Sequence, residues 1–448
     1  MTAIKSVLVQ KLVEPRNISI LVYFRIIFGA IMIWEVFRYF DHDWIADYWI
    51  DPVFHFTYYG FDWVKPLPGD LMYVHFIVMG IAAACMMIGF QYRIASVAFF
   101  VLFSWMFLAE QTRYLNHFYL VCLVSFVLMF VPANRALSVD SILNKKIRTN
   151  YVPGWSLWAL RCQVGVPYFF GGIAKINEDW LRAEPLRSWL SERADTFPLL
   201  GQYFTEEWFV YLFSYGSLFV DLFAVVFLLW RKTRIPMYVI LVSFHLINFQ
   251  LFNIGIFPWF MIFATLIFFE PDWPQKLTRF KIPQKPPFSI SSLTKNQKII
   301  VSLFCIFLIF NFAMPLRHFA YPGEVNWTEE GHNFSWHMKL RDKDTMYVEF
   351  IAVDPVTDEE WYIDPHDELS DRQVSKMSKR PDMVLQYAHF LADQFRNDGY
   401  PEIEIYADVE ILLNDRPPQY LIDPNVDLAK QPITIAPKSW IVPLENHS

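Results

Sequence analysis

Residues 18–40 read ISILVYFRIIFGAIMIWEVFRYF, an apolar run long enough to cross the roughly 30 Å hydrocarbon core of a bilayer as a helix. Similar apolar stretches follow at about 71–90, 92–110, 115–132, 155–175, 208–230, 235–252, 254–270 and 298–315. The chain of 448 residues is 54% hydrophobic and only 19% charged, whereas soluble domains carry roughly 25% charged residues. The sequence therefore predicts a membrane α-helical bundle with about nine transmembrane helices.

The distribution of Lys and Arg among the short loops predicts the orientation of these helices. If residues 1–17 form a cytoplasmic N-terminus, the inner loops hold most of the basic residues, and the first outer loop, 41–70, is rich in Asp. Nine spans then place the C-terminus on the outer face. The segment Pro283–Ser292 is predicted to be a cytoplasmic linker before the last span.

The pattern of the sequence changes near residue 316. Apolar and polar residues alternate over 346–353 and 403–411, which indicates two strands, and Pro381–Phe395 has the pattern of an amphipathic helix that opens with Pro-Asp. We therefore predict three parts: a cytoplasmic N-terminus at 1–17, a transmembrane domain at 18–315, and a small α+β domain at 316–448 on the outer face.

Composition and motifs argue against several classes of function. The net charge is −7 and the basic residues form no long cluster, so nucleic acid is not an expected partner. The sequence has no HExxH, no Cys/His metal spacing, no Walker loop and no GxSxG, so no metal site is predicted. The four cysteines all lie in apolar stretches, which leaves none for a disulfide outside the membrane: Cys85, Cys122, Cys162 and Cys305.

Lys175 ends the fifth apolar stretch, at the predicted outer face. A lysine at a helix end commonly extends to water. Alternatively, burial among apolar groups leaves an amine that serves as a general base. Gly171 and Gly172 lie one turn before Lys175, where the lack of a side chain lets a flat ligand or another helix come close.

Two polar pairs are predicted at the same depth as Lys175. Asn116 and His117 open the fourth apolar stretch, whereas His245 and Asn248 lie three residues apart on one helix face late in the seventh. Helix capping or an inter-helix hydrogen bond would explain each pair by itself. Their convergence beneath an extramembrane domain instead favours a pocket lined by polar side chains.

Ionisable residues inside apolar spans are functional candidates by default. In the first stretch, however, Glu35 together with Arg25 and Arg38 favours a structural ion pair. The aromatic content of 19% suits membrane interfaces and helix packing, and it also suits an aromatic ring ligand such as a quinone.

Nine segments in one order resemble the vitamin K-dependent γ-glutamyl carboxylase family, whose membrane fold is also called the horizontally transferred transmembrane domain. The segments are Tyr92–Ile94, Asn116–Leu120, Ala133–Asp140, Ala174–Trp180, His245–Pro258, Pro271–Pro274, Asn326–Thr328, Phe334–Met338 and Leu413–Asp427. The resemblance runs from about residue 20 to the C-terminus.

The resemblance implies that a lysine amine deprotonates a reduced naphthoquinone, which reacts with O2 and passes through an alkoxide to the epoxide. The alkoxide removes a γ-proton from a glutamate side chain, and the carbanion adds CO2. Lys175 stands at the catalytic-lysine position of the family, and His117 with Asn116 matches the pair that supports oxygenation. His245 and Asn248 match residues that line the quinol pocket.

The substrates follow from the same resemblance. It implies reduced vitamin K or menaquinol as co-substrate together with O2 and CO2, a glutamate-containing peptide or protein, membrane lipid as surroundings, and a quinone epoxide reductase that recycles the product. Basic residues of the outer domain near Trp336 are expected to hold the glutamate carboxylate. They are Arg341, Lys343 and Arg416.

The chain departs from the animal members of the family. Those members continue beyond the equivalent of Trp440–Pro443, and they bridge the first outer loop to the C-terminal domain by a disulfide for which this chain has no cysteines. The short form looks bacterial, which implies an inner-membrane location. Two other functions stay open: a quinol epoxidase without carboxylation, and a non-catalytic quinone- or lipid-binding membrane protein. A transporter is disfavoured because no inverted repeat is visible.

Overall fold

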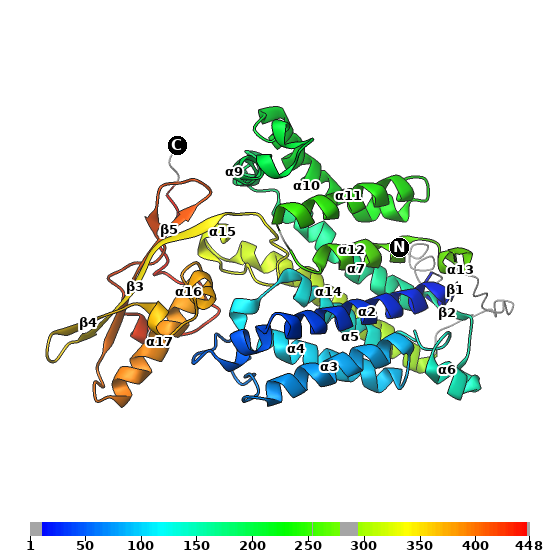
Figure 1. Ribbon diagram of the computed structural model, residues 1–448, viewed down its shortest axis with the longest axis horizontal. Helices are drawn as coiled ribbons and strands as arrows, with labels where there is room; N and C mark the ends of the chain where they lie inside the picture. Colours follow the sequence, from blue (N-terminus) through cyan, green and yellow to red (C-terminus); the bar gives the residue numbers. More distant parts are fainter. Residues whose placement is uncertain (1–10, 253, 278–293, 446–448) are drawn as a thin grey trace.

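The computed structural model describes residues 11–252, 254–277 and 294–445, which form a helical bundle with a smaller sheet-containing domain at one end (Figure 1). The predicted linker Pro283–Ser292 and most of the predicted cytoplasmic N-terminus lie outside these residues. The four cysteines are free, as the sequence indicated.

Each of the nine predicted apolar stretches contains a helix. The helices are α2 (Ser19–Asp41), α3 (Leu71–Ile88), α4 (Tyr92–Leu108), α5 (Asn116–Phe130), α7 (Gly154–Ala174), α10 (Glu207–Leu229), α11 (Arg234–Phe252), α12 (Phe257–Thr265) and α14 (Lys295–Leu316). Among the described helices, five are long and apolar enough to cross a membrane, namely α2, α3, α10, α11 and α14. Nine transmembrane spans therefore stay a prediction.

Shorter elements connect these helices. They are a two-stranded ribbon of β1 (Pro15–Asn17) and β2 (Tyr151–Pro153), and the helices α6 (Val139–Leu143), α8 (Glu178–Leu181), α9 (Leu186–Glu192), α13 (Trp273–Leu277) and α15 (Val325–Thr328). The ribbon pairs the chain before α2 with the chain before α7, so these two long helices begin side by side.

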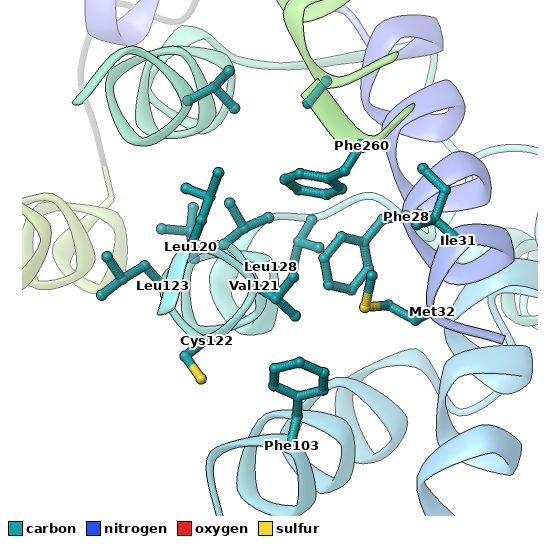
Figure 2. Packing of buried hydrophobic residues seen from close by; sticks show 14 of the residues in the cluster. Phe28, Ile31, Met32, Phe103, Leu120, Val121, Cys122, Leu123, Leu128 and Phe260 are labelled. Atoms are coloured by element: carbon teal, nitrogen blue, oxygen red, sulfur yellow. The ribbon is translucent and has the colours of Figure 1, made fainter. Parts of the chain in front are cut away.

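Aromatic and branched side chains from α2, α4, α5 and α12 interlock in the middle of the bundle (Figure 2). Phe28 on α2 makes an edge-to-face contact with Phe260 on α12, with 6.2 Å between ring centroids, and a similar contact at 5.6 Å with Phe99 on α4. Buried contacts of this kind hold helices together where lipid surrounds them, because close packing rather than water exclusion is the main attraction there.

The charged residues of α2 are structural. Arg38 donates a 2.7 Å hydrogen bond to the Glu35 carboxylate, which confirms an ion pair between these two. Arg25 does not join it. Its buried guanidinium instead donates to the backbone oxygens of Ala133 and Leu137, at 3.1 and 2.6 Å.

The C-terminal domain is a four-stranded antiparallel sheet with two helices. The strands are β3 (Lys343–Asp354), β4 (Glu359–Ile363), β5 (Glu404–Leu413) and β6 (Gln419–Tyr420), in the order β4-β3-β5-β6, and the helices are α16 (Asp371–Met377) and α17 (Pro381–Asn397). Both predicted strands and the predicted amphipathic helix are confirmed. The buried side chains alternate along β5, as expected for a strand with one covered face.

Helices α16 and α17 lie between the sheet and the bundle (Figure 1) and dock on the loop after α2. Gln386 on α17 accepts a 2.9 Å hydrogen bond from the Thr57 nitrogen and donates a 3.1 Å bond to the Thr57 oxygen. Gln373 on α16 donates to the Phe54 oxygen at 2.7 Å, and Phe56 is fully buried in the core of the C-terminal domain. Hydrogen bonds and apolar burial thus join the C-terminal domain to the loop after α2.

Helices α7 and α10 approach each other closely at Gly172. A Cβ atom on Gly172 would lie 2.7 Å from the backbone nitrogen of Leu222 on α10, too close for any side chain. A Cβ on Gly171 would lie 3.2 Å from Met338 Cε and 3.6 Å from Asp221 Oδ2. The two glycines therefore admit another helix and a loop, and neither lines a cavity.

We expect Gly172→Ala to destabilise the bundle by about 1–3 kcal/mol, because the added methyl group meets rigid backbone of α10. Gly216→Ala on α10 is the matched control, since no heavy atom lies within 4 Å of its Cβ position. Alanine also favours a helix over glycine. Thermal unfolding in detergent should therefore show a lower midpoint for the first variant and an equal or higher midpoint for the second. Equal losses in both would contradict the close approach.

Candidate functional site

A cavity of about 440 Å³ lies between α7, α10, α11 and α12, at the bundle end that meets the C-terminal domain. This volume is within the range of about 300–1,000 Å³ typical of small-molecule sites. The walls are mainly apolar, with contributions from α7, α10, α11, α12 and the segment before β3. The polar side chains on the walls are Lys175, Ser217, Asp221, Ser243, His245, Asn248 and Lys339.

Lys175 caps the C-terminal end of α7, and its ammonium forms an ion pair with Asp221 of α10. Both residues are buried, with 5% and 4% of their surfaces exposed, so Lys175 does not extend to bulk water. Its Nζ also lies 5.4 Å from the centre of the Trp180 ring. Asp221 was missed in the sequence, although a single acid in the stretch 208–230 is a signal that could have identified it.

His245 and Asn248 both reach the cavity from α11, as their shared helix face suggested. The Nε2 atom of His245 lies 2.9 Å from the Tyr168 hydroxyl, which in turn lies 2.9 Å from Thr265 Oγ1. The His245 Nδ1 atom is buried and has no hydrogen-bond partner in the described parts of the chain. The Asn248 amide makes no hydrogen bond with described residues either. The site thus has unsatisfied polar groups beside an apolar space.

His117 and Asn116 lie next to the cavity rather than on its wall. The His117 ring is 5.6 Å from the ring of Phe257, whose other neighbour at 5.9 Å is His245. Asn116 donates a 3.0 Å hydrogen bond to the backbone oxygen of His337 in the segment before β3. One aromatic ring therefore separates His117 from the cavity, and Asn116 ties α5 to the C-terminal domain.

The predicted glutamate-binding residues do not line the cavity. Trp336 is buried against Tyr119, with ring centroids 5.0 Å apart. Arg341 forms an ion pair with Glu329. Lys343 donates to the backbone oxygens of Trp327 and Lys379 at 2.6 and 2.8 Å, and burial lowers the pKa of Lys343 to about 7.

Arg416 also has a structural partner and does not line the cavity. Its two terminal nitrogens contact the two carboxylate oxygens of Asp179 at 2.9 and 2.5 Å, and these hydrogen bonds raise the pKa of Arg416. The assignment of Trp336, Arg341, Lys343 and Arg416 to glutamate binding stays a prediction, and the structure gives each of them a structural partner.

Lys339 is the basic residue that the structure adds to the site. Its side chain is exposed at the cavity rim, with Nζ 5.1 Å from the Phe252 ring centre and 5.7 Å from that of Trp189. No carboxylate in the described parts of the chain forms an ion pair with it. Partial desolvation lowers the pKa of Lys339 below its usual range. No local pattern distinguishes this lysine from its neighbours in sequence.

Comparison with protein-family models covers nearly the whole chain. The HTTM domain model matches residues 13–273, and the model of the lumenal domain of vitamin K-dependent gamma-carboxylase matches residues 296–447. No solved structure matches the chain. The second model implies reduced vitamin K as co-substrate, a glutamate-containing protein as substrate, and a lumenal C-terminal domain. Because the HTTM model covers more than half of the chain and the lumenal-domain model covers most of the remainder, this protein belongs to the vitamin K-dependent gamma-carboxylase family.

Proposed function

We propose that this protein is a membrane carboxylase that converts glutamate side chains of a peptide or protein to γ-carboxyglutamate, coupled to oxidation of a reduced naphthoquinone by O2. The observation that carries the proposal is the buried Lys175–Asp221 pair on the wall of an apolar cavity. Burying two charges inside a bundle costs free energy, and ionisable residues that face a cavity within a membrane bundle are functional candidates.

The cavity fits a naphthoquinol. Its apolar walls suit a flat fused ring, and its few polar groups are placed to contact ring hydroxyls: Lys175, His245 and Asn248. The partnerless His245 Nδ1 and the unengaged Asn248 amide are groups that a polar ligand would satisfy. When bound, the reduced quinone and O2 together supply the strong base that takes the γ-proton of glutamate, and CO2 then adds to the substrate.

Lys175 and Asp221 are suited to move one proton. Asp221 is placed to take the proton that Lys175 holds in the ion pair, which would leave Lys175 as an amine. The Lys175 amine would then accept a proton from a hydroxyl in the cavity, so that this proton replaces the one passed to Asp221. The resulting quinol anion takes over the negative charge of Asp221, so the Lys175 ammonium keeps one anion beside it.

The C-terminal domain covers part of the cavity. Met338 and Lys339 of the segment before β3 contribute to its wall, and Trp180 of α8 contributes from the loop after α7. Exclusion of water matters because a carbanion on the substrate is quenched by any available proton. The hydrogen bond from Asn116 to the His337 oxygen helps to hold this segment in place.

We assign the glutamate carboxylate to Lys339. An ammonium without a carboxylate partner, at the rim of an apolar cavity, is a strong point of attraction for an anion. The aromatic rings of Trp189 and Phe252 beside it partly replace water around the charge. A glutamate side chain held there would point its γ-carbon into the cavity that contains Lys175.

The proposal includes the topology and the partners expected from the sequence. The N-terminus lies in the cytoplasm, and the cavity and C-terminal domain lie on the outer face of what we propose is a bacterial inner membrane. Menaquinol is the proposed natural quinol, and a quinone epoxide reductase would recycle the epoxide.

Lys175→Ala should lower both label incorporation and epoxide formation at least about 100-fold, the usual contribution of a general base. The assay measures incorporation of 14C-bicarbonate into a glutamate-rich peptide, with reduced vitamin K or menaquinol and O2, and quinone epoxide in the same tubes. Asp221→Asn keeps the shape but removes the proton acceptor, so we expect a loss of about tenfold or more in kcat with little change in the KM for quinol.

Glu35→Gln is the matched control, because it also removes a buried carboxylate from an ion pair but lies outside the cavity. Its turnover should remain within a factor of about two to three per folded molecule. Epoxide without label in the wild type would favour a quinol epoxidase. If the wild type and Lys175→Ala both gave no product, the remaining hypothesis would be a non-catalytic quinone- or lipid-binding membrane protein.

Lys339→Met should raise the KM for the glutamate peptide by about 10–100-fold, because a charged hydrogen bond contributes roughly 1.5–3 kcal/mol. Lys339→Arg should recover most of the loss, since it restores the positive charge. Lys379→Met is the control, as Lys379 contacts Asp344 and does not line the cavity. An unchanged peptide KM in Lys339→Met would show that another group binds the carboxylate.

A further inference from the structure

The wall segment, residues 331–340, lies between α15 and β3 and contributes Met338 and Lys339 to the cavity wall. Its backbone is strained. Phe334, Trp336 and Lys339 have φ angles of 64°, 62° and 50°, in the left-handed region. Residues other than glycine rarely adopt this region because it costs them free energy. The surroundings of the wall segment therefore hold it in a conformation that its backbone does not favour.

Contacts with the bundle keep the wall segment in place. The backbone nitrogen of Phe334 donates a 2.6 Å hydrogen bond to the hydroxyl of Tyr114, just before α5. The backbone oxygen of His337 accepts the 3.0 Å bond from Asn116, at the start of α5. Loss of these contacts would let the strained backbone relax away from the cavity.

Three histidines meet where the wall segment contacts the bundle. The ring of His337 lies 4.8 Å from that of His318 on the short helix η7 (Arg317–Ala320) and 5.2 Å from that of His332. His332 and His337 are both buried. Neither ring nitrogen of His337 has a hydrogen-bond partner in the described parts of the chain. A proton added to His337 would therefore be buried without an acceptor.

His332 has a different reason to stay neutral. Its Nε2 atom accepts a hydrogen bond from the guanidinium of Arg341. Because a guanidinium only donates, Nε2 must keep its lone pair, and His332 must be the neutral imidazole. A second proton on this ring would break the bond and place two cations against each other.

The groups that face the two histidines come from several elements and are mainly cationic. They are Arg317 and His318 of η7, Glu329 after α15, Arg341, Lys343 of β3, and Arg380 before α17. The single carboxylate of this set, Glu329, already forms ion pairs with Arg341 and Lys343. Burial and then the nearby cations lower the pKa of His332 well below its ordinary value and that of His337 to about 3.

We propose that the wall segment is a pH-operated gate, which stays closed on the cavity at neutral pH and opens when His332 and His337 take up protons. Opening would bring both rings to water, end the repulsion with Arg341 and relax the strained backbone. The gate itself does not depend on the reaction. Its consequence for turnover rests on the proposed function, because an open gate would admit water to the carbanion.

The direction of the response follows from proton binding. A histidine in water has a pKa of about 6.5. Because the closed form binds these protons less readily than the open form, the closed form is fully favoured above that pH and loses stability as the pH falls below it. Each histidine shifts the balance towards the open form about tenfold per pH unit. The gate should therefore respond between about pH 6.5 and about pH 5.

Hydrogen–deuterium exchange of the protein in lipid nanodiscs tests the gate. We compare a peptide that covers 331–340 with one from β5, at about pH 7 and about pH 5, after correction for the intrinsic effect of pH on exchange. We expect protection of 331–340 to fall at least about 30-fold, the effect of one histidine over 1.5 pH units, and protection of β5 to stay unchanged. Exchange requires no turnover, so the result is independent of the carboxylase assay.

The variant His332→Gln/His337→Phe should lose the response to pH, with a fall in protection of less than about threefold. Gln keeps an oxygen that accepts from Arg341, and Phe replaces a ring that has no hydrogen-bond partner by an apolar ring. His389→Gln is the control, because His389 on α17 contacts the backbone oxygens of Leu428 and Gln431 instead of the cluster, and it should respond as the wild type does.

The two single variants keep the test valid if the double variant does not fold. Each should lose about half of the pH response on a logarithmic scale, since each removes one of two protons. Constant protection of 331–340 in the wild type would refute the gate, as would an undiminished response in the histidine variants. An equal loss of protection in β5 would also refute it, because that result would mean unfolding of the whole domain.

Discussion

The close approach of α7 and α10 is the constraint on which the site depends. Two helices can lie this near each other only where one of them lacks a side chain, and Gly172 provides that position opposite the backbone of Leu222. Because Lys175 follows Gly172 by one turn and Asp221 precedes Leu222, the same contact brings ammonium and carboxylate together. A wider spacing would leave two uncompensated charges in apolar surroundings, so packing and chemistry are determined by one geometric feature.

The C-terminal domain contributes to the cavity that the bundle forms. It supplies Met338 and Lys339 to the cavity wall. Three hydrogen bonds position it: Gln386 accepts one from the loop after α2, the backbone oxygen of His337 accepts one from Asn116, and Arg416 donates one to Asp179. Asp179 also accepts a 2.7 Å hydrogen bond from Asn414. Because charge-assisted bonds with paired geometry resist sliding, these contacts can hold the two parts in register without a covalent bridge.

The cavity has a charged side and an apolar side. The rim at Lys339 is charged and lies beside the polar domain, whereas the wall between α10 and α11 is apolar and includes exposed side chains of two helices that are long and apolar enough to cross a membrane. Under the proposed function, a polar peptide and a lipophilic quinol would reach the same space by separate routes, each from the phase in which it is soluble. Neither substrate then has to cross surroundings in which its transfer free energy is unfavourable.

The sequence by itself determined the elements of this protein, because the order of apolar and polar residues sets helix and strand periodicity locally. All nine apolar stretches contain helices, and the strands and the amphipathic helix of the C-terminal domain formed where the pattern placed them. Lys175, His245 and Asn248 were also identified as neighbours from their depth in the bundle. Only the tertiary structure decided which charges meet: Asp221 lies 46 residues from Lys175, and Arg341 and Arg416 pair with Glu329 and Asp179. Those pairings depend on where helices cross and how loops return, which no local pattern records.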